Sequence, residues 1–99
     1  MAEIDKSKLL KQFKLTIGDL TPGTSMDEYY TNFIDMAYQQ LSANDISDKA
    51  LASELGCSAI VLYAKSLMNG EDVASNPTLI LLRNTLSVSS KGDAYVDGA

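Results

Sequence analysis

The most apolar stretch of the chain with helical periodicity runs from residue 51 to residue 69, LASELGCSAIVLYAKSLMN. Apolar residues recur there every three or four positions, which places them on one face of an α-helix. Ile60, Val61 and Ala64 widen that face over most of the circumference. Glu54 and Lys65 are the only charged residues in the stretch. Such a helix must be covered by other helices, so the sequence predicts a helical bundle. Any part of the helix that the bundle leaves exposed would need cover from another chain, which indicates a protein that assembles.

The first of the surrounding helices is expected over residues 6 to about 13, because Asp5 is a suitable N-cap residue directly before it. Its lysines lie away from an apolar side. It is too short to be stable alone and must pack on the rest of the chain. Two glycines and a proline then interrupt residues 16–24, which predicts a loop anchored to the core by Ile17 and Leu20.

A second surrounding helix is predicted from residue 26 to about residue 43. Ser25 and Glu28 have the spacing of a capping box, in which each side chain binds the backbone N–H of the other residue. Apolar residues then recur at helical spacing, with acidic and amide side chains opposite. Three tyrosines lie near this apolar face. Because no basic residues accompany them, core packing is a better interpretation than a stacking surface for bases or sugars.

The central stretch is itself expected to begin after Ser47 or Asp48, either of which can cap it, and to end with Gly70 at the C′ position. Gly56 lies inside this helix, where glycine costs about 1 kcal/mol relative to alanine. Three interpretations of Gly56 remain open: a break, a kink, or a close approach of two helices.

The last predicted helix opens at Asn76 and Pro77, a cap residue followed by a favoured first-turn residue. Arg83 is its only cation. The chain then becomes small and polar over residues 87–99, which predicts either a hairpin turning near Gly92 or a disordered tail.

These elements together predict an all-α fold. Residues 1–86 form a single bundle of about four helices, with a loop after the first helix. Residues 87–99 form a polar C-terminal tail that is flexible or β-like. A chain of 99 residues is long enough for one modest core, near the size at which stability is marginal without partners.

Charge is distributed unevenly along the chain. The net charge of −5 argues against a general nucleic-acid binder, which needs clustered cations. Half of the eight basic residues are Lys6, Lys8, Lys11 and Lys14, so residues 15–99 carry four basic and eleven acidic residues, a formal charge of −7. The basic segment is either a solvated helix face or a surface that docks on an acidic partner.

Catalytic and metal-binding residues are scarce. The chain has no histidine and a single cysteine, which excludes imidazole ligands, Ser/His or Cys/His catalysis and an intrachain disulfide. Cys57 lies in the apolar helix and is expected to be a small buried residue. No catalytic constellation, phosphate loop or metal-ligand cluster is present, so we expect no enzyme activity, no cofactor and no metal. No segment matches a signal peptide or a membrane span, which indicates synthesis in a reducing cytosol.

Residues 51–67 also resemble the helix-turn-helix motif of bacterial repressors, with Ala52, Gly56 and Ser58 at suitable spacing. In that motif the glycine makes the turn and the residues after the serine enter the major groove. Here those positions are the aliphatic residues 59–62, which cannot hydrogen-bond to base edges. A small DNA-binding regulator that uses residues 51–67 is the alternative to an assembly protein, and the aliphatic residues argue against it.

As a whole, the chain resembles the small head-tail connector proteins, also called head-completion or adaptor proteins, of long-tailed bacteriophages. The resemblance covers about residues 4 to 86. It is carried by DKSKLLKQFKL at the start, MDEYYTNFIDMAYQQL, the long apolar helix ending at residues 63–70, and NPTLILLRNTL. The segment after Arg83 lacks an ending typical of that family.

The resemblance implies an all-helical structural protein of the virion, made in the host bacterial cytoplasm. Such a subunit forms a homo-oligomeric ring under the portal and docks the next connector or tail component, and a monomer in solution before assembly is compatible with this. DNA passes through the ring without being bound specifically, and no membrane is involved. Residues predicted to dock partners are Lys6, Lys8, Lys11, Lys14, Arg83, Tyr95 and Val96. The two apolar residues of the tail suit a segment that becomes ordered on a neighbouring subunit.

Overall fold

The computed structural model describes the backbone of residues 5–43 and 46–97, with side chains through residue 88. Over these residues the fold is all-α, as predicted, and contains no strand. The helices are α1 (Lys6–Ile17), α2 (Asp27–Ser42), α3 (Asp48–Ala52), α4 (Glu54–Met68) and α5 (Pro77–Asp97).

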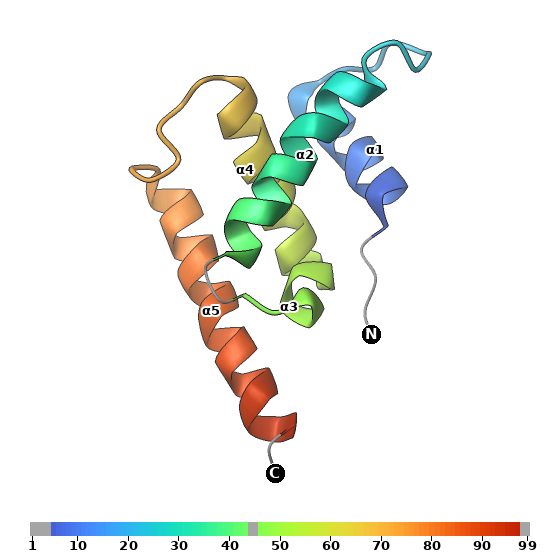
Figure 1. Ribbon diagram of the computed structural model, residues 1–99. Helices are drawn as coiled ribbons and strands as arrows, with labels where there is room; N and C mark the ends of the chain where they lie inside the picture. Colours follow the sequence, from blue (N-terminus) through green and yellow to red (C-terminus); the bar gives the residue numbers. More distant parts are fainter. Residues whose placement is uncertain (1–4, 44–45, 98–99) are drawn as a thin grey trace.

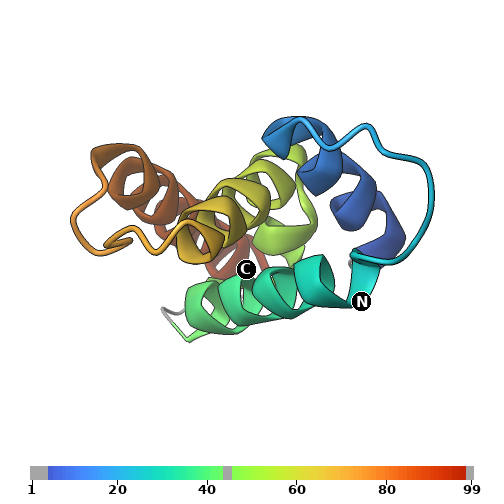
Figure 2. The same ribbon diagram turned by 90° about the horizontal axis from the view of Figure 1, so that it is seen from above.

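Helix α4 is the centre of the bundle and packs against each of the other four helices. In Figures 1 and 2, α1 and α5 lie on opposite sides of α4, while α2 runs along a third side. Ala59, Ile60, Val61 and Ala64 are almost completely buried. The prediction that this helix needs cover over most of its circumference is therefore confirmed.

The core consists of apolar side chains that the surrounding helices turn toward α4. The buried residues outside α4 are Leu9, Phe13, Tyr30, Ile34, Ala37, Leu41, Ile46, Ala50, Leu51, Leu79 and Leu86. The rings of Phe13 and Tyr30 join α1 to α2, with centroids 5.3 Å apart. Burying a side chain as large as leucine or phenylalanine contributes about 1.5–3 kcal/mol, so these contacts dominate the stability.

The predicted single helix over residues 48–69 is broken at Ser53, which has an extended backbone and separates α3 from α4. Its hydroxyl donates to the carbonyl oxygen of Ala50 at 2.5 Å and accepts the N–H of Gly56 at 3.1 Å. Gly56 lies in the first turn of α4, where a Cβ would be only 2.2 Å from the Ala50 carbonyl oxygen. The turn is thus made by Ser53, and Gly56 allows the close approach of α3 and α4.

Other helix ends agree in part with expectation. The Asp5 side chain accepts the N–H of Lys8 at 3.2 Å, which confirms the predicted N-cap of α1. This helix runs beyond residue 13 to Ile17 and ends at Gly18, which has φ +78°. Ile17 packs against the core as expected, but Leu20 is exposed, so the prediction that Leu20 anchors the loop was wrong.

The capping box predicted at the start of α2 is not formed. The N-cap residue is Met26, and no side chain makes a capping hydrogen bond there. A turn in which Asp27 donates its N–H to the Thr24 carbonyl oxygen precedes the helix, so Ser25 lies outside the position required for capping. The end predicted for α4 is confirmed, because Gly70 has φ +71° and the N–H of Glu71 binds the Ser66 carbonyl oxygen at 2.9 Å.

The expected change of structure at residue 87 does not occur. Asn76 caps α5 as predicted, and its side-chain oxygen accepts the N–H groups of Thr78 and Leu79. The helix then continues through Asp97, so the hairpin, one of the two alternatives predicted for this segment, is not formed over residues 87–97. Once Leu79 and Leu86 fix the helix on the core, nucleation has already occurred, and each serine or glycine that follows costs only about 0.5–1 kcal/mol relative to alanine.

We predict that Gly56→Ala destabilises the fold by about 2 kcal/mol. The new methyl group would collide with backbone oxygens of α3, which cannot rotate away, and overpacking of this kind outweighs the gain in helix propensity. Ser58→Ala, on the same helix, is the control and should change stability by less than about 0.5 kcal/mol. Urea denaturation of both variants measures the difference, and an equally stable Gly56→Ala protein would contradict the close approach.

Candidate assembly surface

The predicted docking lysines of α1 do not all face solvent. Lys14 forms an ion pair with Asp27 at the start of α2, and Lys6 Nζ lies 3.1 Å from Asp35 Oδ1 in the middle of α2. Lys8 and Lys11 are exposed. Two of the four lysines therefore attach α1 to α2 within the same chain.

The Lys14–Asp27 pair is the better protected of the two. Lys14 and Asp27 expose only 21% and 28% of their side chains, and Asp27 Oδ1 has almost no contact with solvent. The Lys6–Asp35 pair is more exposed and is expected to contribute little. Of the four lysines, Lys14 thus has a clear structural role and Lys6 forms an exposed ion pair. Lys8 and Lys11 remain available to a partner.

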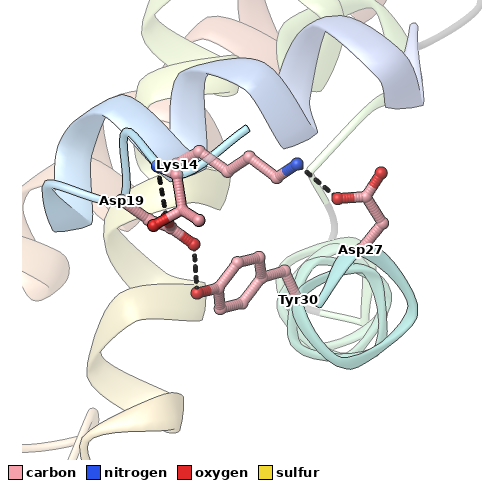
Figure 3. Close-up of polar contacts among 5 residues, drawn as sticks. Lys14, Asp19, Asp27 and Tyr30 are labelled. Atoms are coloured by element: carbon pink, nitrogen blue, oxygen red, sulfur yellow. Dashed lines mark hydrogen bonds and ion pairs between the residues drawn. The ribbon is translucent and has the colours of Figure 1, made fainter. Parts of the chain in front are cut away.

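A second polar contact fixes the loop after α1. The Tyr30 hydroxyl donates to Asp19 Oδ2 at 2.6 Å, and Asp19 Oδ1 accepts the N–H of Thr21 at 3.0 Å. Figure 3 shows the two contacts side by side, with Lys14 reaching Asp27 and Tyr30 reaching Asp19. The hydrogen bond from Tyr30 lowers the pKa of Asp19, and the same bond raises the pKa of Tyr30. The carboxylate and the phenol therefore keep the charged and neutral forms that the bond requires.

Lys14→Gln is expected to destabilise the protein by about 1–2 kcal/mol, because it leaves the shielded Asp27 oxygen without a cation. The matched control is Lys11→Gln, which makes the same change one turn earlier on the exposed side of α1. The control should stay within about 0.5 kcal/mol of the wild type. Thermal denaturation measures both variants, and equal stabilities would show that Lys14 has no structural role.

The remaining predicted docking residues lie on α5. Arg83 is partly exposed. Burial raises the pKa of Tyr63, and the positive charge of Arg83 offsets only part of that rise. The Tyr63 hydroxyl donates to Gln40 Oε1 at 2.7 Å. Tyr95 and Val96 lie within the helical backbone of α5, but their side chains are outside the described residues.

The segment that resembles a helix-turn-helix motif does fold as two helices, α3 and α4, with a turn between them. The positions that would enter a DNA groove begin with Ala59, Ile60 and Val61, whose side chains are 0–1% exposed. They form the centre of the core, so these side chains cannot contact DNA in this structure. The glycine of the motif does not make the turn, which Ser53 makes instead.

Exposed apolar side chains mark two surfaces that the sequence analysis missed. The first, the α5 outer face, is formed by Leu81 and Val88, which expose 67% and 68% of their surface. The second, the α2 stripe, is formed by Met26, Tyr29 and Met36, which expose 43–47%, together with the partly buried Phe33. Periodicity placed Met26, Tyr29 and Phe33 on the apolar face of the helix, because a sequence does not show where a neighbouring helix ends. Met36 lies beside that face, and Val88 belongs to the segment predicted as a polar tail. The available signal was that the apolar face of each helix is wider than one neighbouring helix can cover.

The thiol of Cys57 is half-buried, and its Sγ lies 3.8 Å from the carbonyl oxygens of Leu51 and Ala52. Burial raises the pKa of this thiol, which lowers its reactivity as a nucleophile. Within the described ranges, no group of three or more acidic or cysteine side chains is placed to hold a metal ion. In the same part of the chain, no helix has the length and apolar character needed to cross a membrane.

No family model matches the chain, and neither the curated proteins nor the solved structures contain a match to it.

Proposed function

We propose that this protein is a structural subunit of the head-tail junction of a bacteriophage, which self-assembles into a ring under the portal and docks the next connector or tail component. The observation that carries the proposal is the pair of exposed apolar surfaces on two different helices, the α5 outer face and the α2 stripe. Exposed apolar surface of this kind favours association with a protein. The resemblance noted in the sequence supports the location in the virion.

Two unlike surfaces on one subunit suit a ring. A ring arises when one surface of each subunit binds a different surface of the next and the rotation closes. A two-fold dimer, in contrast, uses a single surface paired with itself. Because the two apolar surfaces here belong to separate helices, each subunit can bind one neighbour with α5 and another neighbour with α2.

The charges support the remaining features of the proposal. A formal charge of −7 over residues 15–99 disfavours binding of the DNA that passes through the ring. Lys8 and Lys11 are exposed on α1 and can meet an acidic surface of a neighbouring component. Arg83, Tyr95 and Val96 remain proposed docking residues on α5.

Light scattering and electron microscopy over a concentration series test the proposal. The wild-type protein should shift from monomer to one discrete closed oligomer, without affinity for double-stranded DNA. Added salt should not dissociate it, since apolar contacts are not screened. Leu81→Gln should weaken association about tenfold, because about 1.4 kcal/mol of apolar burial is lost. Leu15→Gln is the matched control, since Leu15 is a leucine on α1 with a similar exposed fraction, 61% against 67% for Leu81.

Two outcomes would contradict the proposed function: Leu81→Gln and Leu15→Gln have equal effects on association, or a stable dimer binds DNA with a steep dependence on salt. The last result would favour the DNA-binding alternative instead. A wild-type protein that remains monomeric at every concentration would contradict self-assembly without a portal.

A further inference from the structure

A cavity of about 210 Å³ lies where the C-terminal half of α4 meets the connector after it and the first turn of α5. We propose that this cavity is a binding site for a small dipolar molecule, one that carries both a carboxylate and an ammonium group, as a free amino acid does. Sites for drug-sized ligands have volumes of about 300–1,000 Å³. The smaller volume here suits a compact ligand.

The buried hydroxyl of Ser66 shows that the cavity needs a polar occupant. Only 6% of Ser66 is exposed, and it lies on the same side of α4 as Leu62 and Lys65, the side that lines the cavity. The buried tyrosines Tyr30 and Tyr63 both use their hydroxyls in hydrogen bonds. The Ser66 hydroxyl has no such partner among the residues that the structure describes. Because a buried hydroxyl without a hydrogen bond is unfavourable, we expect the cavity to hold a molecule that binds it.

Two opposite charges line the same cavity. Lys65 lies in the last turn of α4 and is partly exposed, while Glu71 lies in the connector and is exposed. In the described part of the chain, neither residue forms an ion pair, with the other or with a third group. A simple anion would be attracted by Lys65 and repelled by Glu71. A dipolar molecule, in contrast, has a partner for each of the two charges.

The start of α5 adds donors for the carboxylate of such a ligand. Asn76 Oδ1 accepts the N–H groups of Thr78 and Leu79, so these backbone groups are already used to cap the helix. The hydroxyl of Thr78 is not used in this way and lines the cavity with the hydroxyl of Ser66. The N-terminal end of α5 also favours negative charge nearby. Leu62 and the buried Leu79 supply apolar contact for the hydrocarbon part of the ligand.

A nuclear magnetic resonance titration of the isotope-labelled full chain with L-alanine tests the proposal. The backbone amide signals of residues 62–66 and 71–79 should shift and reach saturation. Acetate and ethylamine each carry only one of the two charged groups. Both should bind at least about tenfold more weakly than alanine, because each leaves Lys65 or Glu71 without its partner.

Substitutions in the cavity identify the groups that bind. Lys65→Gln and Glu71→Gln should each weaken alanine binding about tenfold, and Ser66→Ala should weaken it about fivefold, as expected for a charged and a neutral hydrogen bond. The matched controls are Lys11→Gln and Glu28→Gln, which make the same changes at exposed positions outside the cavity. Both controls should bind alanine as the wild type does.

Three results would overturn the inference. The first is the absence of a saturable shift with alanine. The second is acetate binding as tight as alanine binding, together with tighter binding of acetate by Glu71→Gln, which would indicate a simple anion site. The third is equal weakening by the control substitutions. None of these results depends on assembly, so the proposed function is tested separately.

Discussion

Burial of most of the circumference of α4 is the constraint on which the rest of the structure depends. Its central residues offer water only a narrow face at Ser58, Leu62 and Lys65, so the chain must supply cover on the remaining sides. Helices α1, α2, α3 and α5 each present a short row of apolar side chains to it. The approach of α3 is close enough to require glycine at residue 56. The positions of the outer helices are thus consequences of one helix that cannot be exposed.

The ion pairs between α1 and α2 connect this packing to the outer surface. Lys14 and Lys6 bind acidic residues on the side of α2 that faces α1. Met26, Tyr29 and Met36 lie on another side of the same helix and expose apolar atoms. Helix α2 thus carries both the acidic residues that hold α1 and the exposed side chains of the α2 stripe.

Much of the fold was predictable because apolar periodicity determines which segments are helical and which faces are buried. The sequence predicted the central helix, the Asp5 and Asn76 caps and the glycine after α4, all of which depend on local chemistry. The break at Ser53 was not predicted, since a serine with a helical sequence on both sides is compatible with either structure. The capping box failed because the preceding turn, rather than the spacing of Ser25 and Glu28, determines where α2 begins.

The candidate surface was less predictable than the fold. Lysines of α1 were assigned to docking, yet two of them bind within the chain, and a sequence does not show which charges become neighbours. Met26 and Tyr29 belong to the apolar face predicted for residues 26–43, yet both are exposed, because helical spacing alone does not distinguish a covered side from an exposed one. The hairpin considered for residues 87–97 is not formed, because a helix already anchored on a core extends through residues of low propensity.

Native-state hydrogen exchange, resolved by residue, measures most directly whether α4 organises the fold. If it does, the backbone N–H groups of residues 59–64 exchange only through global unfolding, and more slowly than those of α1, α2 or the outer part of α5. Faster exchange in α4 than in α2 or α5 would contradict the account, since a different element would then be the most stable part of the structure.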